Sequence, residues 1–476
     1  MKIFLILLSA PLFLISFGTN NSSDNSSEVK LPFQKWAPTP PMGWNSWDCY
    51  GPTVVESEVK TNADYMAKNL RKYGWKYIVI DIRWYVGNDK AGGYNEDNPV
   101  YTLDDYGRLT PAINRFPSAA NGNGFKSIGD YVHSKGLKFG IHTMRGIPVI
   151  AVKKNTPILG SDAKARDIYT TEGQCMWLKD MYTIVAGKPG AQEYYNSLFQ
   201  LYASWGLDFI KVDDLSGRTM EIEMIRKAID NCGRPIVLSI SPGGDRPETA
   251  DFLKKNVNMW RTSNDFWDNW PQLKNQFSIL NRWVGIGVTG CYPDGDMLPL
   301  GKIGLRAERG EPRWSGFTKD EQYTLMTLFS IFRSPLMFGG DLPSNDEFTL
   351  SLISNKDVLY VNQHSANGKQ LFRNNDLIAW CADDPKTGDK FLALFNASDQ
   401  LPIAGNKAIR NSGQITNENA GPVPADTASI TVKFEQLGLT GTHTVKDLWS
   451  GKKLGKFSDE FTRTIRRHGA GLYRIH

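Results

Sequence analysis

Carboxylates with a nearby cation recur in two short patterns of the sequence. The first is Asp208-Phe209-Ile210-Lys211-Val212-Asp213-Asp214, and the second is Trp260-Arg261-Thr262-Ser263-Asn264-Asp265. Side chains alternate along a strand, so Lys211 and Asp213 share a face, and the cation favours the ionised form of Asp213. Two carboxyl groups without a set of metal ligands suit glycosidic bond cleavage, in which one attacks the sugar carbon and the other protonates the departing oxygen. Each pattern alone also fits a structural role: a helix N-cap for Asp213 or Asp214, and a surface turn for residues 260–265.

The elements that must position these residues alternate from about Pro38 to Gln363. Short apolar or β-branched runs indicate strands, and stretches with helical periodicity that end at glycines indicate helices. The expected strands are Met42–Trp47, Tyr77–Asp81, Lys138–His142, Phe209–Asp213, Ile236–Ser241, Met259–Asp265, Val284–Thr289 and Leu336–Gly339. The expected helices are Ser57–Tyr73, Phe125–Lys135, Ala191–Trp205, Met220–Asn231, Trp270–Asn281, Thr318–Phe332 and Asp346–Tyr360. Eight strands with crossover helices predict an α/β fold, a (β/α)8 TIM barrel.

An open doubly wound sheet is the competing topology. It would need a glycine-rich phosphate loop between an early strand and a helix. The GxGxxG match, Gly285-Ile286-Gly287-Val288-Thr289-Gly290, lies late in the chain, inside the expected strand Val284–Thr289, and opens no helix. We therefore interpret this match as chance and retain the barrel.

In a barrel, the carboxyl ends of the strands meet at one mouth, which is where active sites lie. Polar and aromatic residues stand at these ends in the predicted strands. They are Trp44 and Trp47, Asp81, His142, Lys211 and Asp213, Ser241, Arg261 and Asp265, and, after the seventh strand, Asp294 and Asp296. The sequence therefore predicts a site of carboxylates, cations and aromatic rings at this mouth.

The chain divides into four parts. Residues 1–18 read as a signal peptide, with Lys2 before an apolar run, and residues 19–35 as a flexible polar leader. Residues 36–364 form the predicted barrel, and residues 365–476 an antiparallel, sandwich-like β-domain, since short strands there alternate with turn-forming residues. We expect export to the periplasm or the extracellular space, with no membrane span in the mature chain.

The composition excludes several classes of partner. Lys plus Arg is 55 and Asp plus Glu is 50, and this excess of +5 is not concentrated in any basic run, so neither nucleic acid nor anionic lipid is expected. The five cysteines are odd in number, widely spaced and without a CxxC pair, which argues against a zinc site.

The two carboxylate patterns resemble glycoside hydrolase family 27, the α-galactosidase and α-N-acetylgalactosaminidase family. Further matches follow in the same order. They are Pro41-Met42-Gly43-Trp44-Asn45-Ser46-Trp47, Tyr77-Ile78-Val79-Ile80-Asp81, Pro293-Asp294-Gly295-Asp296-Met297-Leu298 and Ser334-Pro335-Leu336-Met337. The resemblance covers about Pro38 to Tyr360, and this family also carries a C-terminal β-domain.

The resemblance implies a retaining double displacement without metal or organic cofactor. Asp213 matches the nucleophile and Asp265 the general acid/base, four residues after the sugar-binding Arg261. Asp81 and Lys211 match residues that bind ring hydroxyls, and Trp44 matches the aromatic floor. Retention predicts the two carboxyl groups at roughly 5–5.5 Å.

The sequence departs from the family at four positions. Ile82 follows Asp81 where many α-galactosidases have a second acid that serves the hydroxymethyl group, and members acting on β-L-arabinopyranosides resemble this sequence in having Ile there. Small residues around Ser241 replace a bulkier loop and leave room for a 2-acetamido group. His142 stands where an aromatic residue is common. Leu215 stands where the family's disulfide beside the nucleophile has its Cys.

These features rank the expected functions. The first is an exo-glycosidase acting on terminal α-D-galactosides of an oligo- or polysaccharide. A β-L-arabinopyranosidase or an α-N-acetylgalactosaminidase of the same mechanism is the alternative. An inert carbohydrate-binding barrel is the competing class, and the presence of both carboxylates argues against it. The sequence leaves the oligomeric state open.

Overall fold

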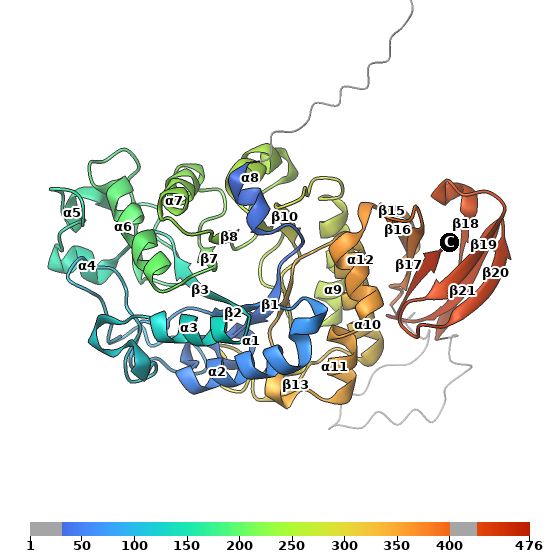
Figure 1. Ribbon diagram of the computed structural model, residues 1–476, viewed down its shortest axis with the longest axis horizontal. Coiled ribbons are helices and arrows are strands. Elements are labelled where there is room, and N and C mark those ends of the chain that lie inside the picture. The colour runs from blue at the N-terminus through green and yellow to red at the C-terminus, as the bar shows by residue number, and fades with distance from the viewer. Residues whose placement is uncertain (1–30, 400–425) are drawn as a thin grey trace, which may run out of the picture.

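The computed structural model describes residues 31–399 and 426–476, so the predicted signal peptide lies outside the described residues. A barrel occupies one end of the elongated molecule and a β-domain the other, with helices between them (Figure 1). The helices are α1 Trp47–Tyr50, α2 Glu56–Tyr65, α3 Lys126–Ser134, α4 Val149–Lys154, α5 Ala165–Ile168, α6 Ala191–Ser204, α7 Thr219–Asn231, α8 Ala250–Asn256, α9 Trp270–Asn281, α10 Lys319–Phe332, α11 Glu347–Ile353 and α12 Lys356–His364.

The barrel sheet is parallel throughout, with strand order β10-β9-β8-β7-β3-β2-β1-β14-β11. Its outermost strands, β10 and β11, are separated in the chain by only Gly295 and Asp296, so the sheet curls until the chain itself joins its two edges. This confirms the predicted TIM-like barrel. The bounds are β1 Met42–Asn45, β2 Tyr77–Ile80, β3 Lys138–Met144, β7 Phe209–Asp213, β8 Val237–Ile240, β9 Met259–Arg261, β10 Tyr292–Asp294, β11 Met297–Leu298 and β14 Leu336–Phe338.

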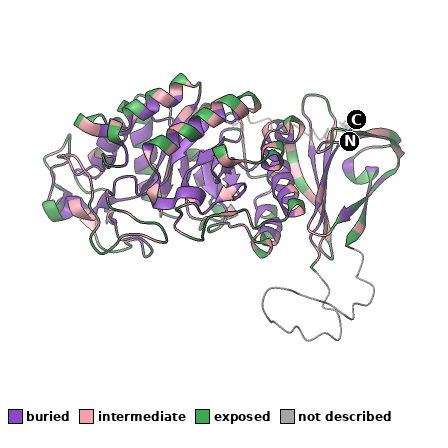
Figure 2. Cartoon of the chain, turned by 90° about the horizontal axis from the view of Figure 1, so that it is seen from below, coloured by how far each residue is buried: buried purple, intermediate pink, exposed green. Residues whose placement is uncertain are grey.

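The barrel strands are buried on both faces, because side chains fill the interior and helices cover the outside. Every residue of β1, β2 and β8 is buried, and the contrast with the exposed outer faces of the helices is visible in Figure 2. The long connection after β3 carries short strands of its own, β4 Ile147–Pro148, β5 Tyr169–Thr170 and β6 Met181–Ile184, and the connection after β11 carries β12 Lys302–Ile303 and β13 Arg313–Trp314.

The predicted position of the seventh barrel strand, residues 284–289, was wrong. Residues 284–289 form a turn, and the barrel strand at this position is β10, eight residues later than expected. Gly285 and Gly290 have φ of 76° and 91°, which the strand conformation excludes. A Cβ at Gly290 would lie 2.2 Å from the carbonyl oxygen of Gln34, so this glycine-rich turn lets the N-terminal segment pack closely against it.

The flexible leader predicted for residues 19–35 ends earlier than expected, because its last residues are structured. Pro32–Trp36 is a 3-10 helix whose Phe33 is buried, and the Arg226 guanidinium lies 4.8 Å from the Phe33 ring. Residues 31–35 therefore belong to the barrel. The predicted helix Asp346–Tyr360 is likewise two helices, because the Asn355 side chain caps the start of α12.

The C-terminal domain contains a six-stranded antiparallel sheet of order β15-β16-β17-β22-β19-β20 and a two-stranded sheet of β18 and β21. Its strands are β15 Ala366–Asn374, β16 Leu377–Asp383, β17 Lys390–Asn396, β18 Thr427–Lys433, β19 Thr442–Asp447, β20 Lys453–Ser458, β21 Glu460–Arg466 and β22 Ala470–Ile475. This agrees with the predicted antiparallel domain.

Helices of the barrel pack directly on this domain. The Phe277 ring of α9 lies 4.9 Å from the Phe395 ring of β17, and Lys274 pairs with Asp376 at 2.6 Å. The Trp449 indole donates to Thr327 of α10 at 2.9 Å, so this tryptophan contributes to the contact between the domains.

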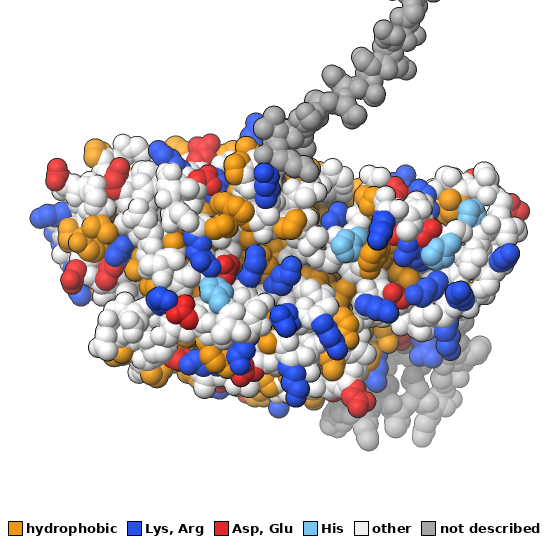
Figure 3. Space-filling model, viewed as in Figure 1, with side chains coloured by type: hydrophobic (Ala, Val, Ile, Leu, Met, Phe, Trp, Pro, Cys, Tyr) orange, Lys and Arg blue, Asp and Glu red, His pale blue; other side chains and the backbone are white. Residues whose placement is uncertain are grey.

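On the face drawn in Figure 3, basic and acidic side chains are interspersed. Among the residues that the structure describes, no helix has both the length and the apolar content to cross a membrane.

Phe395→Ala tests the contact between the domains. Both rings of the Phe277–Phe395 pair are fully buried, so the truncation is expected to cost about 3–5 kcal/mol of unfolding free energy. Urea unfolding of the whole chain measures it. Phe457→Ala removes a partly buried ring of the same domain and is expected to cost less; equal losses in the two variants would contradict the assigned importance of this contact.

Candidate active site

A cavity of about 510 Å³ opens at the carboxyl ends of the barrel strands. Most of the predicted site residues line it: Asp81, Ile82, His142, Lys211, Asp213, Arg261, Asp265 and Asp296. They come from strand ends and the turns that follow, because parallel strands bring their carboxyl ends together. The cavity is therefore where the sequence predicted it.

Asp213 ends β7 and faces His142 across the cavity floor. The distance from its Oδ2 to His142 Nε2 is 3.4 Å, and its Oδ1 accepts the Asp214 N–H at 2.9 Å. Burial alone would raise the pKa of Asp213, but the hydrogen bond and charge of His142, followed by the charge of Lys211, lower it to about 2. Asp213 is thus an ionised carboxylate at neutral pH, as a nucleophile must be.

His142, at the end of β3, connects Asp213 with Asp81. Its Nδ1 hydrogen-bonds Asp81 Oδ1, so each ring nitrogen faces a carboxylate. Burial opposes the protonated form, but the charge of Asp81 outweighs it and the pKa of His142 is raised. The Ile82 backbone nitrogen lies 2.9 Å from Asp81 Oδ1 and 3.3 Å from His142 Nδ1. The Ile82 N–H therefore donates to Asp81 rather than to His142, so His142 Nδ1 can itself act as the donor to Asp81.

Asp81 is held in place from several sides. Its Oδ2 accepts from the Asn45 amide at 2.7 Å and from Lys211 Nζ at 3.3 Å. Burial would raise its pKa, yet the charges of His142 and Lys211 hold it well below the usual range. Lys211 in turn has a raised pKa, since the carboxylates of Asp81 and Asp213 outweigh its burial.

A second group of charges stands on the other side of the cavity. Arg261 ends β9, and its Nη2 lies 2.6 Å from Asp296 Oδ2 and 3.4 Å from Asp265 Oδ1. The Asp265 side chain is 53% exposed, whereas that of Asp296 is buried. Asp265 therefore lies where it can reach both a leaving group and water.

Asp296 lies at the seam of the barrel, between β10 and β11, with φ of 98°. Burial raises its pKa, and although Arg261 lowers it, the charges of Asp265 and Asp294 add to the increase, giving about 7. Its Oδ2 accepts the Phe266 N–H at 2.7 Å, just after Asp265, so Asp296 also helps to place the acid/base candidate.

Three predicted contact residues do not line the cavity. Trp44 is fully buried, with its indole donating to the Gly340 carbonyl at 2.8 Å, and Trp47 takes the position in the wall instead. The predicted strand Met42–Trp47 ends at Asn45 and turns into α1, which brings Trp47 rather than Trp44 to the mouth. Ser241 is buried, and the next residue, Pro242, lines the cavity in its place. Asp294 accepts the Asp296 N–H at 2.9 Å and so supports a residue that does line the cavity.

Asp48 is a cavity residue that the sequence analysis missed. It is 3% exposed, and its Oδ2 is without a hydrogen-bond partner. Burial, followed by the charge of Asp296, raises the pKa of Asp48 well above the usual value, which favours the protonated carboxyl, the form that can donate a hydrogen bond. A Cβ at Gly339 would lie 1.9 Å from this Oδ2, so Gly339 leaves the space for it. Its position directly after Trp47 is the sequence signal that could have identified it.

An ion-pair cluster lies beside Asp213, the candidate nucleophile. Arg145, just after β3, pairs with Asp214 Oδ2 at 2.7 Å and with Glu221 at 3.0 Å, and its Nε donates to the Asp214 carbonyl at 2.6 Å. Asp214, with φ of 56°, supplies the N–H bound by Asp213. Arg145 therefore fixes the turn that orients the nucleophile, while Leu215 is buried in the core.

The arrangement defines a carboxylate-based hydrolytic site. One carboxylate is ionised and held by cations, and a second is exposed at the mouth beside an arginine, which is the division of roles that glycosidic bond cleavage needs. Within residues 31–399 and 426–476, no cluster of His, Cys, Asp and Glu has the makings of a metal site. The fold and the site together define a glycoside hydrolase.

Comparisons with known proteins specify the family. Residues 160–364 match the alpha galactosidase A family model, and residues 374–475 match the alpha galactosidase C-terminal beta sandwich domain. A GH27 β-L-arabinopyranosidase from Geobacillus stearothermophilus is 47% identical, with a TM-score of 0.86 over 93% of this chain and 97% of that one. A variant of that enzyme in complex with arabinose is 46% identical, with a TM-score of 0.86 over 94% of this chain and 99% of that one. Alpha-galactosidase 2 of Arabidopsis thaliana is 27% identical over 99% of both chains. The chain belongs to glycoside hydrolase family 27.

His142→Gln tests the electrostatic role of the histidine. Loss of the imidazolium removes the main influence that lowers the pKa of Asp213, so this pKa should rise by about one unit or more. Because Asp213 must be ionised to attack, the acidic limb of the kcat/KM profile should move to higher pH. A pH profile of kcat/KM measures the shift. His443→Gln, in the C-terminal domain, is the control, and an acidic limb equal in all three proteins would contradict this role.

Proposed function

We propose that this protein is an exported, retaining β-L-arabinopyranosidase. The observation that carries the proposal is Ile82, which lines the cavity directly after the hydroxyl-binding candidate Asp81. L-arabinopyranose has the ring hydroxyl arrangement of D-galactose but lacks the hydroxymethyl group. The apolar Ile82 side chain has no partner for that group's hydroxyl, and burying a hydroxyl without a hydrogen bond costs about 1–3 kcal/mol.

The inner cavity supplies the contacts that a pentopyranose requires. Asp81 and Lys211 present a carboxylate and an ammonium group to ring hydroxyls, and Asp48 adds a carboxyl oxygen without a hydrogen-bond partner, Oδ2. The half-buried Trp47 ring offers an apolar face for the sugar. The sugar is held in this way between polar groups and one aromatic surface, the usual composition of a small-molecule site.

The reaction then proceeds in two displacements. Asp213 attacks the anomeric carbon to form a covalent glycosyl-enzyme, and Asp265 protonates the departing oxygen. In the second step Asp265 removes a proton from water, which attacks the same carbon and releases Asp213. The buried cations beside Asp213 stabilise its ionised state before attack and after release.

α-D-Galactoside hydrolysis is the second candidate. The similarity of the chain to curated plant alpha-galactosidases over almost its whole length favours it. Export rests on the N-terminal residues, where Lys2 precedes the apolar run from Ile3 to Phe17.

Asp213→Ala tests the nucleophile. Hydrolysis of nitrophenyl β-L-arabinopyranoside should fall by about 10⁴-fold or more, because no other group forms the covalent intermediate. Asp265→Ala should retain more activity on this substrate, since nitrophenolate leaves without protonation. Initial rates of the purified variants provide the measurement, with the exposed Asp251→Ala as control. Near wild-type activity of Asp213→Ala would refute the assignment.

Ile82→Asp tests the specificity. The new carboxylate provides a partner for the hydroxymethyl group, so the ratio of kcat/KM for α-D-galactoside to that for β-L-arabinopyranoside should rise about tenfold to a hundredfold. Parallel rates on the two nitrophenyl glycosides measure the ratio. Ile82→Val keeps the position apolar and should leave it near the wild-type value. A ratio unchanged by Asp would argue that another residue selects the sugar.

A further inference from the structure

The turn after β2 has two side chains in the cavity lining and the next one outside it. Asp81 and Ile82 line the cavity, whereas Arg83 is completely buried and is not part of the lining. The Ile82 N–H donates to Asp81 Oδ1 at 2.9 Å, so the orientation of this carboxylate depends on the backbone of the turn. Whatever holds that backbone in place therefore bears on how the sugar is bound.

Arg83 anchors the turn, and all three nitrogens of its guanidinium are hydrogen-bonded. Nε and Nη2 form a fork on the two oxygens of Asp180, at 2.8 and 3.0 Å. Nη1 lies 3.1 Å from Asp89 Oδ1, and Nη1 and Nη2 each lie 3.2 Å from the Asn95 carbonyl oxygen. Burial lowers the pKa of Arg83, but the hydrogen bond and charge of Asp180 raise it overall, so the guanidinium stays charged. A two-pronged contact of this kind fixes the direction of the side chain as well as its position.

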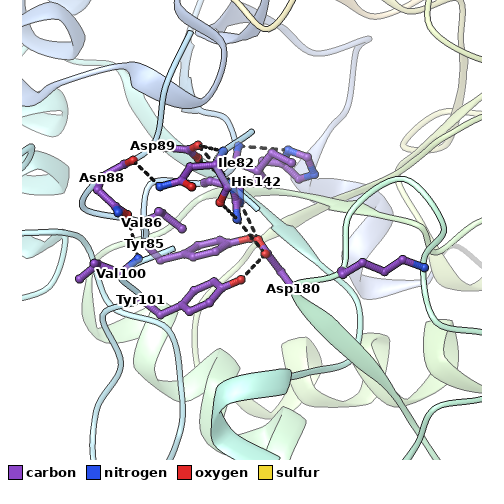
Figure 4. Close-up of polar contacts among 12 residues, drawn as sticks. Ile82, Tyr85, Val86, Asn88, Asp89, Val100, Tyr101, His142 and Asp180 are labelled. Carbon is purple, nitrogen blue, oxygen red and sulfur yellow. Dashed lines mark hydrogen bonds and ion pairs between the residues drawn. The ribbon is translucent and has the colours of Figure 1, made fainter. Parts of the chain in front are cut away.

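Asp180 is a buried carboxylate that accepts from four groups. Figure 4 shows the hydroxyls of Tyr85 and Tyr101 converging on it; they donate at 2.8 and 2.5 Å, one to each oxygen. Its backbone carbonyl accepts the Val149 N–H of α4 at 2.9 Å, which ties the cluster to the connection after β3. A carboxylate bound in this way holds Arg83 in one orientation, and its loss leaves a buried cation without its main partner.

The same cluster reaches two other parts of the cavity lining. The Arg83 guanidinium lies 5.3 Å from the Tyr94 ring, and Asp180 follows Trp177 by three residues. Both aromatic rings line the cavity, and they lie 6.5 Å apart. One buried ion pair thus joins three segments that contribute to the lining: the turn with Ile82, and the connections with Tyr94 and Trp177.

Other contacts of the turn do not involve the Arg83 side chain. The Trp84 indole donates to the His142 carbonyl at 2.7 Å, and Arg115 Nη1 donates to the Arg83 carbonyl at 2.9 Å. Because these contacts remain available when the ion pair is removed, the end of β3 with His142 keeps its attachment to the turn. Loss of the pair should therefore change the orientation of residues 81 and 82 rather than unfold this end of the barrel.

We propose that Arg83 and Asp180 are positioning residues for the binding of the terminal sugar. Their ion pair fixes the turn after β2, and the turn in its place orients Asp81 and holds Ile82 in the cavity wall. Neither member of the pair lines the cavity, so both act through residues 81 and 82. The inference rests on the proposed function, since the sugar concerned is the glycosyl group that is transferred to Asp213.

Asp180→Asn tests the ion pair. The amide has nearly the volume of the carboxylate, but its NH2 group cannot accept a hydrogen bond from Arg83 or from a tyrosine hydroxyl. We expect KM and the inhibition constant of the free monosaccharide to rise about threefold to tenfold, with kcat within about twofold, because Asp81 contacts the sugar before and during the reaction. Initial rates on the nitrophenyl glycoside that the wild type hydrolyses faster provide the measurement, with L-arabinose or D-galactose as the matching inhibitor.

The inhibition constant separates positioning from a structural role. A smaller fraction of folded enzyme lowers the apparent kcat and leaves KM and the inhibition constant unchanged. Asp384→Asn is the matched control, since Asp384 is completely buried and pairs with Arg474 at 2.7 Å, but in the C-terminal domain. This control should leave both constants near the wild-type values, and thermal unfolding reports how far each variant is destabilised.

Two further variants keep the test decisive if Asp180→Asn does not fold. Arg83→Lys retains the positive charge but cannot form the fork, so both constants should rise as in Asp180→Asn. Tyr101→Phe removes one donor from Asp180 and retains the ring, so both constants should rise by about twofold.

The outcomes distinguish the positioning role from the proposed function. Unchanged constants in the Asp180 and Arg83 variants, a fall in apparent kcat alone, or an equal rise in Asp384→Asn would overturn the positioning role and leave the proposed function standing. A wild type that hydrolyses neither the β-L-arabinopyranoside nor the α-D-galactopyranoside would refute the proposed function itself.

Discussion

The site depends on one buried chain of charges, Asp81–His142–Asp213, with Lys211 beside it. These four titratable groups lie on or just after three neighbouring strands. Asp81 and His142 are buried, and Asp213 and Lys211 are largely so, which is costly unless each group is paired. Pairing with the cations outweighs the burial of Asp213 and leaves it ionised. These contacts therefore offset the cost of burial and keep the carboxylate of Asp213, the candidate nucleophile, ionised. The register of β2, β3 and β7 brings the groups within reach of one another.

Elsewhere in the cavity, burial has the opposite result and raises the pKa of two carboxyl groups. Asp296, at the two-residue seam between β10 and β11, and the buried Asp48 have raised pKa values because their one nearby arginine or lysine does not compensate for the loss of water. Carboxyl groups with raised and with lowered pKa values thus face each other across one cavity. The contrast follows from the positive charge near each carboxyl, which is that of both His142 and Lys211 for Asp213.

The outer part of the cavity is built from different elements than its floor. Strand ends supply the inner residues, but Tyr94 and Trp177 lie in long connections, whose positions are set by the buried Arg83 and its contacts with Asp180 and Asp89. Because Arg83 follows Ile82 directly, the turn after β2 that places Ile82 in the cavity wall also anchors the connections that carry Tyr94 and Trp177.

The sequence by itself determined the barrel, the antiparallel domain and most of the inner site. These depend on local periodicity and on the rule that parallel strands gather their carboxyl ends, so Asp81, His142, Lys211, Asp213, Arg261 and Asp265 could be placed without coordinates. Only the tertiary structure decided where the seventh strand lies, that Trp47 and not Trp44 reaches the mouth, and that Asp48 is buried with a raised pKa. It also brought the Tyr94 and Trp177 rings together in the cavity lining, because contacts between distant connections arise from packing, which no local pattern encodes.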